Sequence, residues 1–267
     1  MALPPPTLDN TVVVTGASAG IGAELARQLA NRNYNVVLVA RRAARLQELA
    51  EGLRLTHGVH ADVETCDLAD ADARGELVER LRAGERAIAG VCNNAGFGSV
   101  APLLESDLER ERQIVRLNVE AVQQLTGAFL HDMVDRGAGA ILNVASTAAF
   151  QPLPGFASYA ASKAFVQSFS EAVHTELTGT GVSVTCLFPG FTRTEFVENP
   201  GAEGAESTIP GFLWMEAPDV ARVGIDAMLA GHRTAIPGMK NRALMLSGRM
   251  TPRTVLLPLV RQVTRRR

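Results

Sequence analysis

The stretch "VVVTGASAGIGAEL", residues 12–25, passes from a run of β-branched residues through three glycines into an amphipathic pattern. The first part predicts a buried strand, and the apolar spacing after the last glycine predicts a helix. Gly16, Gly20 and Gly22 allow a sharp turn between the two and let a pyrophosphate approach backbone N–H groups at the positive end of the helix. Taken alone, this G-x-x-x-G-x-G spacing also fits a tight turn that binds nothing.

The change from strand pattern to helix pattern recurs along the chain, and this alternation predicts an α/β fold built on a doubly wound parallel sheet of seven strands. Two of the expected helices, over residues 105–136 and 157–177, are richer in apolar residues than one solvated face needs. Helices of that kind often meet a partner subunit. The seven expected strands begin near Thr11, Asn35, Val59, Ala87, Gly139, Val182 and Arg233.

The length of 267 residues and the 46% hydrophobic composition suit one large α/β domain rather than two small ones. We expect a Rossmann-type domain over residues 1–238, in which the long loop over residues 191–218 acts as a substrate lid. Residues 239–267 are expected to form a helical extension with eight Lys and Arg and no acidic residue. Three alternatives stay open for this basic extension: it lies on an anionic membrane, docks an acidic carrier protein, or packs on its own domain.

Other features narrow the class of protein. A formal net charge of −2 gives no overall electrostatic reason to expect nucleic acid as a partner. The three cysteines are far apart and form no C-x-x-C pair, and the five histidines show no metal-ligand spacing, so neither a disulfide framework nor a metal site is predicted. The start of the chain lacks a signal-peptide pattern, and no run of 18 apolar residues occurs. We therefore expect a cytoplasmic protein without a membrane span.

The end of the second expected strand bears on the kind of dinucleotide that would bind. The segment "VLVARRAAR", residues 37–45, places Arg41 and Arg42 where a site for NAD normally carries an Asp or Glu that holds the ribose 2′-hydroxyl. A guanidinium can instead pair a 2′-phosphate through two parallel hydrogen bonds, so NADP(H) is the predicted cofactor. The alternative is that both arginines are solvated residues at the start of a helix.

Tyr159 and Lys163 stand four residues apart in an expected helix, so they lie on one face, about a turn from each other. A nearby ammonium favours the phenolate, lowers the pKa of the phenol from its ordinary value near 10, and makes it a usable acid or base. Ser146, at the carboxyl end of the fifth expected strand, lies at the edge where open α/β sheets bind ligands, and its hydroxyl can hydrogen-bond a substrate carbonyl. A Y-x-x-x-K pair by itself is often an ordinary helix surface.

Together these motifs resemble the short-chain dehydrogenase/reductase family, and the match covers nearly the whole chain. The family pattern T-G-x-x-x-G-x-G corresponds to Thr15–Gly22, N-N-A-G to Asn93–Gly96, and the P-G motif after the sixth strand to Pro189–Thr194. Asn118, in "RLNVEA", matches the asparagine of the family's catalytic tetrad, which the tyrosine, lysine and serine complete. The resemblance implies a single Rossmann-type domain that moves a hydride between a nicotinamide and an alcohol or carbonyl carbon.

The resemblance also implies residue roles. Tyr159 would donate the proton in reduction, while Lys163 would lower its pKa and bind the nicotinamide ribose. Ser146 would orient the carbonyl, and Asn118 would anchor a chain of waters that leads to the lysine. The residues implied to contact the cofactor are Gly16, Ser18, Gly20, Ile21 and Gly22 at the first turn; Arg41 and Arg42 at the second strand; Asp67 and Leu68 beside the adenine; Asn94, Ala95 and Gly96 along the groove; Tyr159 and Lys163; and Pro189, Gly190, Thr192 and Thr194, the last two at the carboxamide.

One position departs from the NADP-binding pattern of the family. Many NADP-binding members carry a basic residue just before the second glycine of the turn, where this chain has Ala19. Recognition of a 2′-phosphate would then rest on Arg41, Arg42 and Ser18.

Apolar side chains near the expected substrate entrance favour an apolar substrate, although several would also serve to pack the lid onto the domain. They are Phe97, Phe150, Leu153, Phe156, Phe191, Phe196, Phe212, Trp214 and Met215. Two functions remain: an NADPH-dependent reductase for an apolar ketone, aldehyde or 3-oxoacyl group, or a non-catalytic NADP(H) sensor on the same fold. The chain keeps all four tetrad residues, which favours the enzyme. The two long helices resemble the family's dimer surface, which implies a homodimer or homotetramer.

Overall fold

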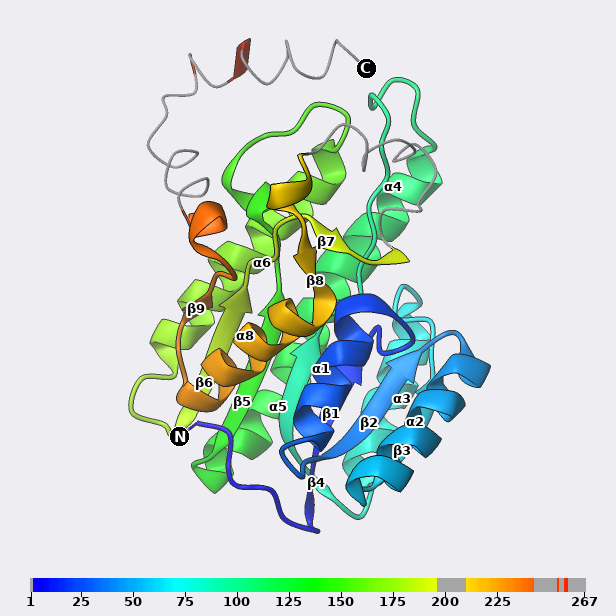
Figure 1. Ribbon diagram of the computed structural model, residues 1–267, viewed down its shortest axis with the longest axis vertical. Helices are drawn as coiled ribbons and strands as arrows, with labels where there is room; N and C mark the ends of the chain where they lie inside the picture. The colour runs from blue at the N-terminus through cyan, green and yellow to red at the C-terminus, as the bar shows by residue number, and fades with distance from the viewer. Residues whose placement is uncertain (1, 196–209, 243–253, 255–256, 259–267) are drawn as a thin grey trace.

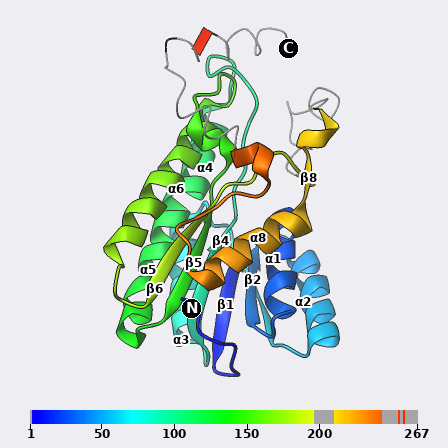
Figure 2. The ribbon, with the colours of Figure 1, turned by 60° about the vertical axis from the view of Figure 1, so that its left-hand side comes forward.

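The computed structural model describes residues 2–195, 210–242, 254 and 257–258, so most of the expected lid and extension lies outside the described residues. Within the described part, helices cover both faces of a central sheet in three layers (Figures 1 and 2). The α/β fold class predicted from the alternation of patterns is therefore confirmed.

The seven predicted strands are all present, and they pair in parallel in the order β3-β2-β1-β4-β5-β6-β9. The chain runs outward from β1 in one direction and then returns to β4 on its other side, so the order reverses between these two strands. Ligands of doubly wound sheets bind outside the carboxyl ends of the strands at such a reversal. The strands are β1 (Asn10–Thr15), β2 (Asn35–Ala40), β3 (Ala61–Thr65), β4 (Ala87–Asn93), β5 (Gly139–Val144), β6 (Val182–Leu187) and β9 (Thr234–Ala235).

Each face of the sheet has its own apolar core, because β1 is buried on both sides. Val12 and Val14 pack with Leu25 and Leu29 of α1, whereas Val13 belongs to the cluster on the opposite face. Figure 2 shows α1, α2 and α8 on one side of the sheet and α4, α5 and α6 on the other. The bounds of the helices in the two layers are α1 (Gly20–Ala30), α2 (Ala43–His57) and α8 (Ala217–Ala230), then α3 (Ala71–Ala83), α4 (Leu108–Val115), α5 (Ala121–Arg136) and α6 (Ala157–Glu176).

The helix predicted over residues 105–136 is interrupted by a wider turn. Between α4 and α5 lies η1 (Arg116–Glu120), a π-helical turn in which the N–H of Ala121 donates to the carbonyl of Arg116. The flanking residues keep right-handed helical dihedral angles, so the three pieces form one continuous helix. Single π-turns in α-helices often mark functional sites, and this one contains Asn118.

The segment predicted as a lid loop begins and ends in regular structure. β7 (Thr192–Arg193) pairs in parallel with β8 (Met215–Glu216), and a short 3₁₀ turn, η4 (Gly211–Leu213), comes just before β8. The two ends of the predicted lid loop thus contain short strands, and its role as a lid stays a prediction. A ladder of two residues in each strand is too short to leave a periodic pattern in the sequence.

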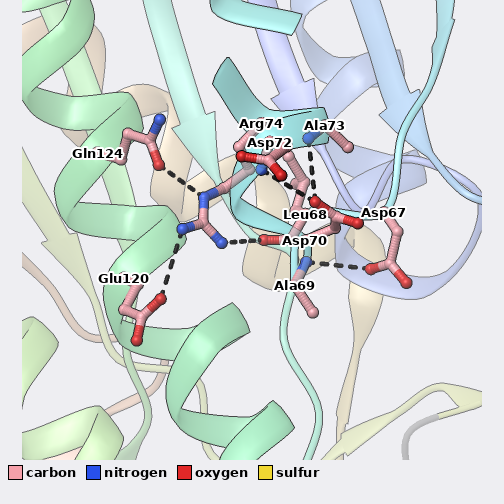
Figure 3. A network of polar contacts seen from close by, with 9 residues as sticks. All are labelled: Asp67, Leu68, Ala69, Asp70, Asp72, Ala73, Arg74, Glu120 and Gln124. Atoms are coloured by element: carbon pink, nitrogen blue, oxygen red, sulfur yellow. Dashed lines mark hydrogen bonds and ion pairs between the residues drawn. The ribbon is translucent and has the colours of Figure 1, made fainter. Parts of the chain in front are cut away.

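A buried arginine joins the loop after β3 to the long helix, as Figure 3 shows. The Arg74 side chain is only 3% exposed, and its Nη1 donates to the Leu68 carbonyl at 2.7 Å. Its Nε donates to Gln124 Oε1 at 2.8 Å, and its Nη2 lies 3.5 Å from a Glu120 carboxylate oxygen. Since Leu68 belongs to the predicted adenine-binding pair, Arg74 holds one wall of the expected groove in place.

We expect Arg74→Leu to lower the free energy of unfolding by roughly 2–3 kcal/mol, because the change removes charged hydrogen bonds and leaves the buried Leu68 carbonyl without its donor. The control is Arg112→Leu, which removes an ion pair to Glu109 from an arginine that is 67% exposed. That variant should change the free energy of unfolding by less than about 0.5 kcal/mol. Urea denaturation measures both, and equal effects of the two substitutions would contradict the network.

Candidate active site

Three of the predicted motifs meet at the carboxyl edge of the sheet. The glycine turn follows β1 and the N-N-A-G segment follows β4, the two strands on either side of the reversal in strand order, and Ser146 follows β5, the next strand beyond β4. Figure 1 shows this edge of the sheet beneath β7 and β8. The fold thus gathers side chains that are up to 130 residues apart along the chain.

The glycine turn has the geometry of a cradle for an anion. Gly16 and Gly20 have φ angles of +66° and +54°, in the left-handed region that glycine adopts readily. A Cβ on Gly22 would lie 2.2 Å from the Gly16 carbonyl oxygen, so no larger residue fits there. Ala19, at the N-cap of α1, offers no side-chain acceptor to the first N–H groups of the helix. These features fit the pyrophosphate of a dinucleotide.

The N-N-A-G segment is fastened to the first strand through one threonine. The backbone N–H groups of Asn94 and Ala95 both donate to Thr15 Oγ1, at 2.9 and 3.0 Å. The Thr15 hydroxyl in turn donates to the Cys92 carbonyl at 3.2 Å, and the Asn94 amide donates to the Thr15 carbonyl at 3.0 Å. The two segments predicted to line the cofactor groove therefore lie against each other.

The structure brings the predicted serine, tyrosine and lysine together. Ser146 and Tyr159 share a side-chain hydrogen bond, and Lys163 Nζ lies 5.8 Å from the centroid of the tyrosine ring. The lysine is 5% exposed and donates to the Val144 carbonyl at 2.8 Å, whereas the tyrosine is partly exposed. The arrangement places a phenol and a hydroxyl side by side, over a buried ammonium.

Burial shifts both titratable groups toward their neutral forms. It raises the pKa of Tyr159 above the ordinary value for a phenol, and the hydrogen bond with Ser146 works against that rise. It lowers the pKa of Lys163 from 10.5 to about 8. In the structure, the group that lowers the pKa of the Tyr159 phenol is thus Ser146. The resemblance implies that Lys163 lowers this pKa, and that effect stays a prediction.

Asn118 is fully buried and clamps the segment after β4 to α6. Its Nδ2 donates to the Phe97 carbonyl and to Ser162 Oγ, both at 3.0 Å, while its Oδ1 accepts from the Phe97 N–H at 3.2 Å. A Cβ on Gly96 would lie 2.9 Å from Asn118 Oδ1 and 3.4 Å from Lys163 Nζ, so this glycine allows the segment to approach both groups. The asparagine therefore positions the site, and its predicted link to a chain of waters stays a prediction.

The residues predicted at the adenosine end of the cofactor lie together beyond the glycine turn. Arg42 donates from Nε and Nη2 to Ser18 Oγ at 3.1 and 3.0 Å. The exposed side chain of Arg41 has its Nη1 3.8 Å from a carboxylate oxygen of Asp67, next to Leu68. Both arginines thus stand at the end of β2, where the Arg42 guanidinium already donates to a protein oxygen.

Two charged residues in this region were missed by the sequence analysis. Glu195 accepts from Arg42 Nη1 at 2.7 Å and also forms an ion pair with Arg45. Arg45 could have been noticed, because it lies in the first turn of α2, three residues after Arg42 at the N-cap. Glu195 carried no local signal, since 153 positions separate it from Arg42.

The P-G motif lies between the serine turn and the glycine turn. The Pro189 carbonyl accepts from the Thr147 N–H at 2.9 Å, next to η2 (Thr147–Phe150). Thr192 is buried and its hydroxyl donates to the Gly190 carbonyl at 3.0 Å. A Cβ on Gly20 would lie 3.0 Å from the Thr194 methyl group, so the motif closes over the turn.

The aromatic residues expected near the substrate divide into two groups. Phe150 is buried and its ring packs against that of Phe188, with centroids 5.0 Å apart, so it belongs to the core and not to a substrate pocket. Phe156 lies next to the catalytic candidate Tyr159, with centroids 6.3 Å apart. Phe196 lies outside the described residues. The remaining members are partly or largely exposed: Phe97, Leu153, Phe191, Phe212, Trp214 and Met215.

A cradle for a pyrophosphate beside a phenol and a hydroxyl defines a dinucleotide-dependent oxidoreductase, in which the phenol serves a carbon–oxygen centre. The comparisons with known proteins agree. A family model described as "short chain dehydrogenase" matches residues 10–204. The sulfoacetaldehyde reductase 2 of Chromohalobacter salexigens is 35% identical over 221 residues, which cover 81% of this chain and 87% of that protein.

Solved structures give the same result. A short-chain dehydrogenase from Sphingobium yanoikuyae in complex with NADPH is 33% identical, with a TM-score of 0.81, over 90% of this chain and 92% of that chain. A bulky-bulky ketone specific alcohol dehydrogenase from Comamonas testosteroni is 29% identical, with a TM-score of 0.76, over 91% of this chain and 93% of that chain. The protein therefore belongs to the short-chain dehydrogenase/reductase family and is an oxidoreductase.

The part of the chain that the structure describes bears on membrane spanning and on metal binding. In that part, no helix is both long and apolar enough to cross a membrane. The same residues contain no group of three or more His, Cys, Asp or Glu side chains that could hold a metal ion.

The lowered pKa of Lys163 predicts how stability depends on pH. Between pH 8 and 10.5 the unfolded chain binds more protons at this lysine than the folded protein does, so stability rises with pH. We expect the free energy of unfolding of the wild type, relative to Lys163→Met, to increase by roughly 2 kcal/mol from about pH 7 to about pH 9.5.

Urea denaturation of both proteins across this range gives the measurement. Lys240→Met is the control, because Lys240 is the other lysine of the chain and is exposed. A difference between the wild type and Lys163→Met that stays constant with pH would show that the lysine is not buried as the structure has it.

Proposed function

We propose that the protein is an NADPH-dependent carbonyl reductase that converts an apolar ketone, aldehyde or 3-oxoacyl group to an alcohol, in a reversible reaction. The observation that carries the proposal is the hydrogen bond between Ser146 and Tyr159, with the Lys163 ammonium beneath the phenol. A non-catalytic sensor would not need an acid and an orienting hydroxyl at the end of the cofactor groove. The same residues would run the reaction in the direction of alcohol oxidation.

The preference for NADP(H) is supported by charge at the end of β2. The strand ends at Ala40, and no carboxylate of the strand is available for a ribose 2′-hydroxyl. Arg41, Arg42 and Ser18 instead offer several N–H and O–H donors to a 2′-phosphate. The similarity to a short-chain dehydrogenase in complex with NADPH supports the same cofactor.

NADPH, when bound, would supply the hydride. The residues of this chain that would hold it are the glycine turn, Asn94–Gly96 and Pro189–Thr194, with Lys163 at the ribose next to the nicotinamide. Gly22 and Gly96 allow the close approach that this binding requires.

The proton chemistry falls to the side chains above the groove. The Ser146 hydroxyl would donate a hydrogen bond to the substrate carbonyl and orient it. The Tyr159 hydroxyl would donate its proton to the carbonyl oxygen as negative charge develops there. A pKa above the ordinary value keeps the phenol protonated at neutral pH, which suits reduction better than oxidation.

An apolar substrate is supported by the side chains around the phenol. Phe156 lies against Tyr159, and Phe97 and Phe191 stand at the same edge of the sheet with part of their surface accessible. The similarity to an alcohol dehydrogenase named for bulky ketones supports a ketone, and the relative named as a sulfoacetaldehyde reductase supports an aldehyde.

We also propose that the protein forms a homodimer or homotetramer through α4 and α6, which pack beside each other. Five large apolar side chains are exposed on α4, on α6 and just before α4, as is typical of an interface. These side chains are Leu103, Leu104, Leu108, Val115 and Phe165. Light scattering should return two or four times the mass of one chain, and a single-chain mass would contradict the proposal.

A cytoplasmic location of the protein also stays a prediction.

We expect Tyr159→Phe to reduce kcat for carbonyl reduction by roughly 100-fold or more, because the proton donor is lost, while the Kd for NADPH changes little. The matched control is Tyr34→Phe, since Tyr34 is the other tyrosine, is buried, and donates only to the Pro4 carbonyl among the contacts described. Oxidation of NADPH against a panel of apolar ketones, aldehydes and 3-oxoacyl thioesters gives the measurement. NADPH binding without turnover on any member of the panel would favour the sensor.

A further inference from the structure

A carboxylate of the protein occupies the arginines at the adenosine end of the groove. Glu195 Oε2 lies 2.7 Å from Arg42 Nη1, and its Oε1 pairs with Arg45 Nη1. All three side chains are between 41% and 49% exposed, so the group is accessible to a ligand from solution. One acidic side chain therefore pairs with two basic ones at the start of α2.

Both edges of the Arg42 guanidinium form hydrogen bonds within the protein. Its Nε and Nη2 donate to Ser18 Oγ, and its Nη1 donates to Glu195. These are the donors of Arg42 that a 2′-phosphate would use beside the glycine turn. A phosphate that binds there consequently meets the carboxylate of Glu195.

The backbone before Glu195 is held against the glycine turn, which distinguishes this carboxylate from an ordinary surface residue. Thr192 and Arg193 form β7 and pair with β8. The methyl group of Thr194 would be 3.0 Å from a Cβ on Gly20, so it packs on the turn itself. The two ion pairs with α2 also hold the carboxylate in its charged form, because hydrogen bonds from Arg42 and Arg45 lower the pKa of Glu195.

We propose that Glu195 is a specificity-determining residue that competes with the 2′-phosphate of NADPH for Arg42 and Arg45, and so narrows the preference for NADPH over NADH. This inference rests on the proposed use of NADP(H). A 2′-phosphate carries nearly two negative charges at neutral pH, whereas exposed ion pairs are individually weak, so the phosphate displaces the carboxylate at some loss of affinity. NADH has a hydroxyl at that position and leaves the ion pairs intact.

The test is the Kd of NADPH and of NADH for the wild type and Glu195→Gln, measured by isothermal titration calorimetry. Glutamine keeps the size of the side chain and removes its charge. We expect Glu195→Gln to bind NADPH roughly three- to ten-fold more tightly and NADH within about two-fold of the wild type.

The matched control is Glu216→Gln on β8, whose carboxylate faces Arg193 at 3.5 Å and not the arginines of α2. It should leave both Kd values within about two-fold of the wild type. Adenosine 2′,5′-bisphosphate and adenosine 5′-monophosphate serve as additional probes, because they lack the nicotinamide half. Glu195→Gln should tighten binding of the bisphosphate and leave the monophosphate unchanged.

The outcomes separate the two proposals. If the wild type prefers NADPH and Glu195→Gln does not lower the Kd of NADPH, the role of Glu195 is overturned. The proposed cofactor then still stands. Weaker NADH binding by Glu195→Gln also overturns that role, since it would mean that the carboxylate holds a ribose hydroxyl. A wild type that binds NADH more tightly than NADPH overturns both proposals.

Discussion

The close approach of two backbone segments at Gly16 and Gly22 is the constraint on which the site depends. A Cβ at Gly22 would lie 2.2 Å from the Gly16 carbonyl oxygen, and a Cβ at Gly16 would lie 2.7 Å from the Asn94 amide nitrogen. Because glycine occupies these positions, α1 can start directly above β1 and the segment after β4 can lie beside it. Thr15 then holds that segment in place, and the two segments together form the proposed groove for a dinucleotide.

Burial connects this groove to the chemistry. Asn118 and Lys163 form the floor of the site, and both are almost completely removed from solvent. The asparagine is satisfied by three hydrogen bonds, whereas the lysine is left with a lowered pKa of about 8. The same low-dielectric surroundings raise the pKa of Tyr159, so the phenol keeps its proton at neutral pH. Burial of these side chains therefore keeps on Tyr159 the proton that its proposed role requires.

The sequence was sufficient for the features that arise from short-range pattern. β-branched runs predicted all seven strands of the main sheet. The motifs predicted that Ser146 and Tyr159 share one site, and the structure places their side chains in hydrogen-bond contact. What it could not reveal depends on three-dimensional partners. Phe150 is an aromatic residue of the kind that lines pockets, but it packs in the core. Arg74 is of a type that is usually exposed, but it is buried. The pairing of Glu195 with α2 and the π-turn in the long helix leave no periodic signal.

The proposed reaction is the transfer of a hydride between NADPH and a carbonyl carbon at the site formed by the glycine turn and Tyr159. NADPH that carries deuterium at C4 of the nicotinamide exists as two stereoisomers. Each is supplied separately to the enzyme, together with a ketone or aldehyde that the enzyme reduces. We expect one stereoisomer, and not the other, to place deuterium on the carbinol carbon of the alcohol, as detected by NMR. Alcohol that forms without deuterium from either stereoisomer would contradict the proposed transfer.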